Sequence, residues 1–179
     1  MKVVAVVGSP HKTGNCAYLV DEALKEIAKA GIETEKISLA EVSIAPCQGH
    51  EGCAGFKVCK IKDDGPEAIR KFNEADAVIL ASPVYFYDVT AQMKSFIDRN
   101  YFTFTHEQGK KAKTAGLIAI GGGGGGEATL NTLKAFIHLP EKDIFVLEGY
   151  TGQGSAKDKP ALGKQAREMG KKIAGKLGK

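Results

Sequence analysis

Long hydrophobic runs are missing from this chain of 179 residues. None is longer than residues 3–7, and such a run is far shorter than the roughly 20 apolar residues that a membrane-spanning helix needs, so no membrane partner is expected. Proline is scarce, with 6 residues, and glycine does not recur at every third position, which excludes a collagen-like protein. Apolar residues at 43% and charged residues at 26% are globular values and exclude a disordered chain.

Signals of nucleic-acid binding are also missing, because the chain has neither RNP-like aromatic motifs nor a helix-turn-helix pattern. The formal charge is +4, and much of the excess lies in the last twenty residues. There the basic residues alternate with apolar ones at helical spacing, which predicts the solvent face of an amphipathic helix and no nucleic-acid partner. The first residues lack the features of a secretory signal, so a cytoplasmic location is expected.

Five short runs rich in β-branched residues alternate with helical patterns. The predicted strands are residues 2–7, 33–38, 77–81, 114–120 and 144–148, and helices are predicted to start near Asn15, Glu67, Thr90 and Glu127, with the basic helix last. This alternation is typical of βαβ units around a parallel sheet with helices on both faces. The residues Asp64 to Glu67 predict a start similar to a capping box, and Gly31 predicts the end of the first helix.

The loops that follow the first, third and fourth strands are expected to meet at one edge of the sheet, where α/β proteins bind ligands. The loop at residues 8–15 contains neither a P-loop motif nor Gly-x-Gly-x-x-Gly, which disfavours a nucleoside triphosphate and a dinucleotide fold. Its hydroxyls and backbone amides at a helix start favour a monophosphate, although a plain tight turn is the alternative.

Aromatic residues and glycines mark the other two loops. Residues 82–89 contain three consecutive aromatics, Tyr85, Phe86 and Tyr87, which cannot all point into a core, so a planar ligand or a subunit interface is expected there. Glycine is in excess, with 22 residues, and six of them run consecutively at residues 121–126, where bare backbone can approach a flat ligand. A phosphorylated planar cofactor accounts for all three loops, and flavin mononucleotide (FMN) fits.

These loops resemble those of the flavodoxin-like NAD(P)H-dependent FMN reductases, and within them the iron-sulfur flavoproteins. The resemblance rests on residues 8–15, on Ser82-Pro83-Val84-Tyr85-Phe86 with the segment at residues 93–99, and on the glycine run with Glu127. It implies a doubly wound sheet of order 2-1-3-4-5, with residues 1–179 forming one FMN-binding domain that carries a cysteine-rich insertion at about 41–63.

The resemblance also implies the residues that hold the cofactor: a phosphate loop, a flavin-ring loop and the first glycines of the run. His11 and Cys16 stand where the family often has Arg and Ser or Thr, so Lys12 is the candidate to supply charge and weaker FMN binding is expected. Cys16, on the apolar side of its helix, is expected to be a packed thiol. The predicted set is Ser9, His11, Lys12, Thr13, Gly14, Asn15, Cys16, Pro83, Val84, Tyr85, Phe86, Gly121, Gly122, Gly123 and Glu127.

Three of the four cysteines cluster in the pattern Cys47-x2-His50-x2-Cys53-x5-Cys59. A disulfide framework is implausible in the cytoplasm, so metal or redox chemistry is the natural interpretation. In the iron-sulfur flavoproteins the corresponding loop binds a 4Fe-4S cluster through four cysteines, and here His50 takes the second position. Histidine also ligates iron in Rieske centres. Zinc and a loop without metal are the alternatives.

The predicted function is FMN-dependent electron transfer between a donor, NAD(P)H or a ferredoxin-like carrier, and an acceptor. The chemistry belongs to the cofactor, so no catalytic residue is assigned. The resemblance implies a homodimer or homotetramer. Two alternatives remain open: a flavodoxin-type electron carrier without enzymatic activity, and a metal-binding module without flavin.

Overall fold

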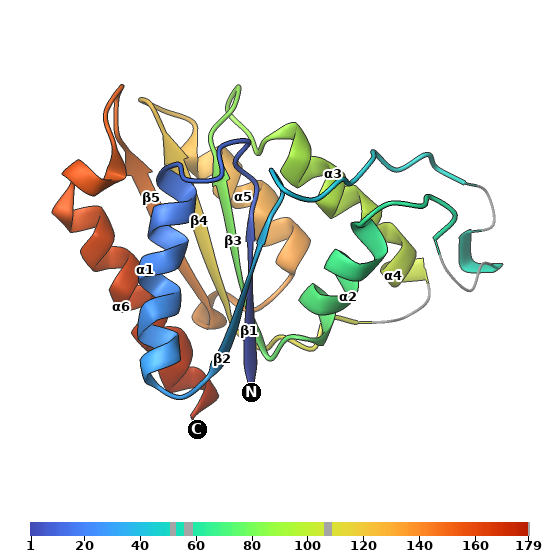
Figure 1. The fold of residues 1–179 in the computed structure, drawn as a ribbon, viewed down its shortest axis with the longest axis horizontal. Helices are drawn as coiled ribbons and strands as arrows, with labels where there is room; N and C mark the ends of the chain where they lie inside the picture. The colour runs from blue at the N-terminus through green and yellow to red at the C-terminus, as the bar shows by residue number, and fades with distance from the viewer. Residues whose placement is uncertain (51–52, 56–58, 106–108, 179) are drawn as a thin grey trace.

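A computed structural model describes residues 1–50, 53–55, 59–105 and 109–178. Its centre is one parallel sheet of order β2-β1-β3-β4-β5 (Figure 1). The strands are β1 (Lys2–Val7), β2 (Glu33–Ser38), β3 (Ala77–Pro83), β4 (Ala115–Gly121) and β5 (Ile144–Tyr150). Both the strand order and the parallel pairing confirm the predicted doubly wound sheet.

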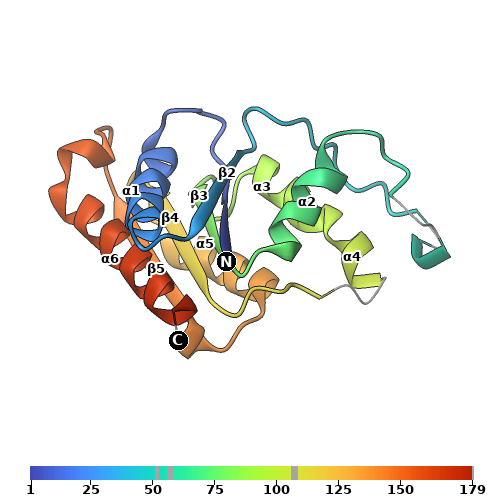
Figure 2. The same ribbon diagram turned by 60° about the horizontal axis from the view of Figure 1, so that its bottom comes forward.

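Helices cover both faces of the sheet (Figure 2). One face packs against α1 (Asn15–Lys29) and α6 (Pro160–Leu177), and the other against α2 (Gly65–Glu74), α3 (Ala91–Arg99) and α5 (Gly126–Ile137). The described part of the chain adds α4 (Tyr101–Thr105) and the short turns η1 (Cys53–Gly55), η2 (Glu141–Asp143) and η3 (Ala156–Asp158). None of its helices is long and apolar enough to cross a membrane.

Each covered strand contributes to two apolar cores because its successive side chains point to opposite faces. Val3 packs in the core under α1 and α6, whereas Val4 packs in the core under α2, α3 and α5, and both side chains are fully buried. This double burial explains why β1, β3 and β4 are nearly continuous apolar runs.

Two predicted helix ends have clear structural outcomes. Gly31 follows α1 at φ +76°, a left-handed conformation that glycine adopts without strain, so the predicted stop is confirmed. The capping-box interpretation of Asp64 is wrong, since its side chain does not cap α2 but accepts a hydrogen bond from the Ser43 amide at 2.7 Å. The Asp64 carboxylate therefore holds together the start and the end of the cysteine-rich segment (residues 41–63) and does not cap the helix.

Candidate functional site

The loops after β1, β3 and β4 lie together at the carboxyl edge of the sheet, at the top of Figure 1. In the first loop, the Ser9 side chain is buried and its Oγ accepts a hydrogen bond from the His11 amide at 3.1 Å. His11, Lys12 and Thr13 are exposed. No side chain caps α1, so the amides of its first turn point toward this loop with no capping group in place.

Two members of the predicted phosphate set have side chains that face the protein. The Asn15 side chain donates through Nδ2 to Thr151 Oγ1 at 3.3 Å, and its Oδ1 accepts from the Ala156 backbone amide at 2.9 Å. Cys16 is only 2% exposed, and burial raises the pKa of its thiol to about 12, which confirms the packed thiol. Asn15 and Cys16 can therefore offer an anion their backbone amides, whereas the Cys16 thiol cannot reach it.

The aromatic loop has an unusual backbone. Tyr85 and Asp88 exchange two backbone hydrogen bonds, of 2.9 and 3.1 Å, across a two-residue turn. The two residues inside that turn, Phe86 at φ 52° and Tyr87 at φ 65°, are both in the left-handed region. This is the conformation of a type I′ turn, which strongly favours Asn-Gly. Bulky side chains there carry strain, and such strain is concentrated at functional sites.

The sequence predicted that the three aromatic side chains could not all point into the core. In the structure none of them is buried. Tyr85 is 47% exposed, Tyr87 72% and Phe86 fully exposed. Together they form an aromatic surface beyond the carboxyl end of β3, which we call the aromatic loop surface (Tyr85, Phe86 and Tyr87). A planar ligand or another protein chain can bury such a surface.

Thr90 joins the first loop to the aromatic loop, a role that sequence reasoning missed. Its hydroxyl is completely buried, donates to the Gly8 carbonyl at 2.5 Å and accepts from the Met93 amide at 3.2 Å. Its own amide donates to Ser82 Oγ at 3.1 Å. The signal in the sequence is a threonine at the predicted start of a helix, which is a preferred N-cap residue.

The glycine run divides into positions that require glycine and positions that do not. At Gly125 the φ is +81°, and a Cβ would lie 2.9 Å from the Tyr87 Cα, so this residue lets the third loop pack against the aromatic loop. At Gly126 a Cβ would collide with the Glu148 side chain. At Gly123 and Gly124 a Cβ would meet no atom within 4 Å, so the bare backbone faces open space there.

The end of β5 completes the edge of the sheet and was also missed. The Thr151 and Gly152 amides donate to the carbonyls of Gly121 and Gly122, each at 3.0 Å, which fixes the start of the glycine run. The Tyr150 hydroxyl donates to the Glu148 carboxylate, and this hydrogen bond raises the pKa of Tyr150. Nearby, Glu127 is exposed in the first turn of α5, where its side chain faces solvent.

The four predicted metal ligands lie outside this edge, on the cysteine-rich segment (residues 41–63), which extends to the far right of Figure 1. Cys47 is exposed, while His50, Cys53 and Cys59 are half-buried. Among the described residues, no three His, Cys, Asp or Glu side chains lie close enough together to hold a metal ion. Three thiols and an imidazole are nevertheless donors that iron-sulfur clusters and zinc accept, so the chemistry of the set fits a metal while binding would have to draw the ligands together.

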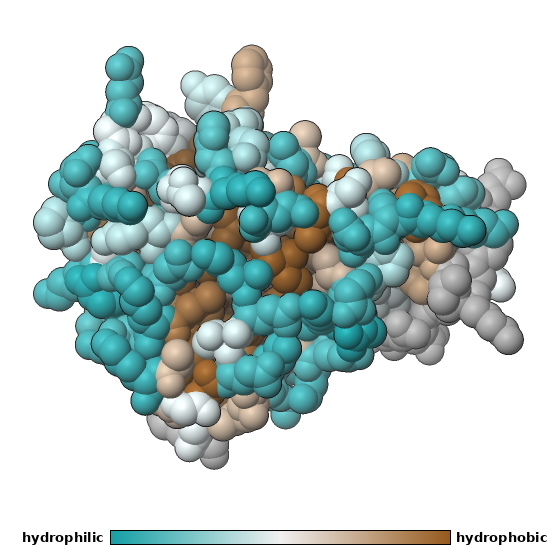
Figure 3. Space-filling view, in the orientation of Figure 1, coloured by the Kyte–Doolittle hydropathy of each residue, from teal (hydrophilic) through white to brown (hydrophobic). Residues whose placement is uncertain are grey.

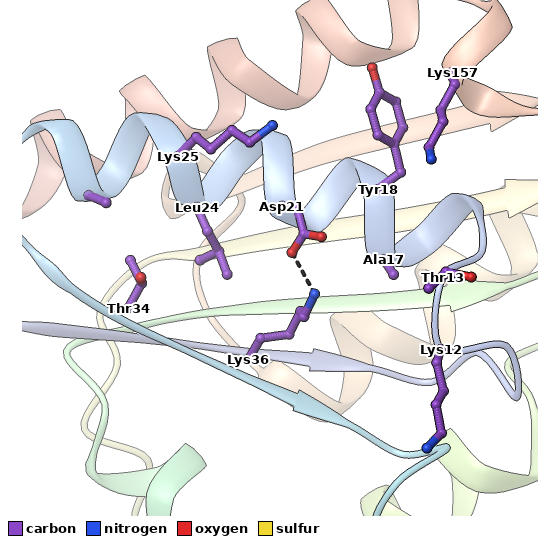
Figure 4. Close-up of a pocket in the computed structure, with 11 residues that line it drawn as sticks. Lys12, Thr13, Ala17, Tyr18, Asp21, Leu24, Lys25, Thr34, Lys36 and Lys157 are labelled. Carbon is purple, nitrogen blue, oxygen red and sulfur yellow. Dashed lines mark hydrogen bonds and ion pairs between the residues drawn. The ribbon is translucent and has the colours of Figure 1, made fainter.

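A groove of about 560 Å³ adjoins the first loop but runs away from the other two, between α1 and β2 (Figure 4). Apolar side chains show through this part of the surface, bordered by hydrophilic ones (Figure 3). Of its lysines, Lys36 pairs with Asp21 at 2.6 Å and Lys12 with Glu41 at 3.4 Å. Because the aromatic loop surface and the glycine run are not part of this groove, the edge of the sheet remains the better candidate site.

Comparison with known proteins agrees with the fold. Residues 1–150 match the family model described as NADPH-dependent FMN reductase. An iron-sulfur flavoprotein of Methanocaldococcus jannaschii is 40% identical over 97% of this chain and 96% of its own length. An iron-sulfur flavoprotein of Methanosarcina thermophila is 31% identical over 78% of this chain and 74% of its own.

Among solved structures, an NAD(P)H:quinone oxidoreductase from Methanothermobacter marburgensis has the same fold, with a TM-score of 0.75 at 16% identity. That match covers 96% of this chain and 98% of the other. The five-stranded parallel sheet, the loops at its carboxyl edge and these matches lead to one conclusion: the chain belongs to the NADPH-dependent FMN reductase family, with iron-sulfur flavoproteins among its relatives, and is an FMN-dependent oxidoreductase.

Proposed function

We propose that FMN binds at the carboxyl edge of the sheet, with its phosphate in the loop between β1 and α1. Ser9, Thr13 and the amides of residues 14–16 are the hydrogen-bonding groups, supported by the uncapped start of α1. Lys12 is the cation available on this loop, because its ion pair with Glu41 is long and both side chains are exposed. His11 replaces the arginine common in the family, which favours weaker phosphate binding.

The flavin ring, in this proposal, is held between the loop after β3 and the glycine run. Residues 83–86 offer one side of the site, and the glycines at 121–123 offer the other, with the least crowded backbone at Gly122 and Gly123. The observation that carries the proposal is the type I′ turn at Phe86 and Tyr87, because a sequence selected only for stability would place Asn-Gly there. Glu127, at the start of α5, lies beside the same loop.

When bound, FMN supplies the hydride and electron chemistry, while the protein contributes binding and orientation. NAD(P)H is the proposed donor, and a ferredoxin-like protein is the other donor class. Anaerobic mixing of FMN-loaded protein with NADPH or NADH tests this, read out as loss of the oxidised flavin absorption. Reduction on mixing and steady turnover with an acceptor are expected; a flavin that neither nucleotide reduces would make the protein an electron carrier instead.

We further propose that Cys47, His50, Cys53 and Cys59 bind a 4Fe-4S cluster, which would supply single-electron transfer. The spacing of the four ligands and the chemistry of the donor set support it. Iron, sulfide and zinc analysis of anaerobically purified protein tests it. About four irons per chain, lost in a His50→Ala variant, support the cluster, whereas zinc alone or no metal rules it out.

The aromatic loop surface also bears on assembly. In this proposal the protein is a homodimer or homotetramer of one FMN-binding domain, with the segment at about 41–63 as its insertion, and the aromatic loop surface lies near a subunit boundary. Free thiols are kept reduced in the cytoplasm, which is the proposed location. Light scattering coupled to size exclusion measures the assembly, and a monomer at micromolar concentration would contradict this part of the proposal.

A further inference from the structure

Arg99, at the end of α3, is a buried cation directed at the cysteine-rich segment. The residue is only 2% exposed. One terminal nitrogen donates to Asp63 Oδ2 at 2.6 Å and to the Ala45 carbonyl at 3.0 Å. The other donates to Asp63 Oδ1 at 3.0 Å and lies 3.5 Å from Cys59 Sγ. A single guanidinium therefore contacts both ends of the segment and one of its predicted ligands.

Asp63 is positioned just as firmly. Its side chain accepts from the Ala45 amide at 2.8 Å and from the Gly65 amide at 2.9 Å, in addition to the two bonds from Arg99. A buried ion pair of this kind is weak evidence for stability, because well-packed apolar residues often stabilise a protein as much. The position of this ion pair beside Cys59 therefore points to a role in the chemistry of that sulfur.

The helix that ends at Arg99 begins at the flavin side of the molecule. α3 starts directly after Thr90, which is hydrogen-bonded to Gly8 in the first loop, and ends nine residues later at Arg99. At 1.5 Å per residue the helix spans about 14 Å. Figure 1 shows α3 running from the top edge of the sheet toward the cysteine-rich segment. One rigid element thus carries the aromatic loop at its start and contacts Cys59 at its end.

We propose that Arg99 is a positioning residue for Cys59 and that its N–H donor and positive charge raise the reduction potential of a cluster ligated by that sulfur. This inference rests on the proposed 4Fe-4S cluster. Hydrogen bonds to ligating sulfurs and nearby charge are the means by which proteins tune such potentials. A cation beside the sulfur favours the reduced cluster, which carries one more negative charge, and Asp63 offsets part of that effect.

The test compares Arg99→Gln, Asp63→Asn and Arg99→Lys with the parent protein, all reconstituted with ferrous iron and sulfide. The readout is the cluster potential, from a redox titration followed by electron paramagnetic resonance. Arg99→Gln is expected to lower the equilibrium constant for reduction about tenfold, which is about 59 mV for one electron. Asp63→Asn is expected to move the potential in the opposite direction, because the cation then lacks its counter-charge. Arg99→Lys keeps the positive charge but loses the planar guanidinium that contacts Asp63 and Cys59 at once, so its potential should shift less than that of Arg99→Gln.

Lys94→Gln is the matched control, since Lys94 lies on α3 itself but is exposed and pairs with Asp98. Its potential is expected to equal that of the parent. Shifts of the same sign in Arg99→Gln and Asp63→Asn, or none in either, would overturn the inference and leave the cluster in place. If Arg99→Gln does not fold, Arg99→Lys takes its place. Potential shifts of opposite sign in Arg99→Lys and Asp63→Asn then support the inference, and shifts of the same sign or none in either overturn it. A parent protein that binds no iron overturns the cluster and this inference together, and iron analysis identifies that case.

Discussion

The strained turn of the aromatic loop offers a sharp test, because stability and binding should change in opposite directions. We consider a double variant, Phe86→Asn with Tyr87→Gly, which installs the preferred type I′ sequence without altering the turn. Both parent side chains are in the left-handed region, at φ 52° and 65°. Both are largely exposed, so little packing is lost with them.

The size of the effect follows from the backbone. A left-handed conformation costs a residue with a side chain roughly 1–2 kcal/mol, and two such residues are relieved in the variant. Glycine returns roughly 0.5–1 kcal/mol of that gain by its freedom in the unfolded chain. The FMN-free variant is therefore expected to be about 1–3 kcal/mol more stable, which raises Tm by about 2–4 °C per kcal/mol.

Thermal unfolding of the FMN-free protein and flavin titration of the same samples provide the two measurements. FMN affinity should fall about tenfold or more, since stacking on an aromatic side chain contributes about 1–3 kcal/mol. Tyr101→Asn is the control, because Tyr101 is 56% exposed on α4 and is not among the residues at positive φ. A double variant that is less stable than the parent would refute the strain argument. Unchanged FMN affinity would refute the role of the aromatic loop surface at the flavin.

Three further predictions concern residues whose environment is well defined. Thr90→Val removes an N-cap and leaves the Gly8 carbonyl without its donor, so urea unfolding should show a loss of about 2–4 kcal/mol, whereas a loss below about 0.5 kcal/mol would mean that the hydroxyl is dispensable. Gly125→Ala should cost about 2–4 kcal/mol through its φ and its contact with the aromatic loop, while Gly123→Ala, which has open space, should cost less than about 1 kcal/mol. The high pKa of Cys16 keeps its thiol neutral at pH 8, so iodoacetamide should modify exposed Cys47 first in metal-free protein and reach Cys16 only on unfolding, as peptide mass analysis would show; early labelling of Cys16 would contradict its burial.

Much of the fold could be predicted because its signals are local. Continuous apolar runs identified the covered strands, and the helical spacing of Leu162, Ala166, Met169 and Ile173 identified the buried face of α6, which the structure confirms. The prediction failed at Asp64, where the local pattern of a capping box competed with a distant partner, the Ser43 amide, and the distant partner prevailed. The last strand is also longer than predicted. It was expected to end at residue 148, but its pairing with β4 continues to Tyr150, opposite Gly121.

The candidate site was only partly predictable, for the same reason. The three loops could be located from the sequence because each directly follows a strand. The groups that join them could not, since Thr90 reaches Gly8 across 82 positions and Asn15 reaches Thr151 across 136. The division of the glycine run into required and open positions depends on Tyr87 and Glu148, which are distant in the sequence.

The most direct test of the central claim, that FMN lies at this edge with its phosphate on the β1–α1 loop, compares FMN with riboflavin. Titration of the flavin-free protein, followed by flavin fluorescence, gives both affinities. Each hydrogen bond to a charged phosphate contributes about 1.5–3 kcal/mol, so two of them predict that FMN binds at least about 100-fold more tightly, at one per chain. Equal affinities for FMN and riboflavin, or no binding of either, would contradict the account.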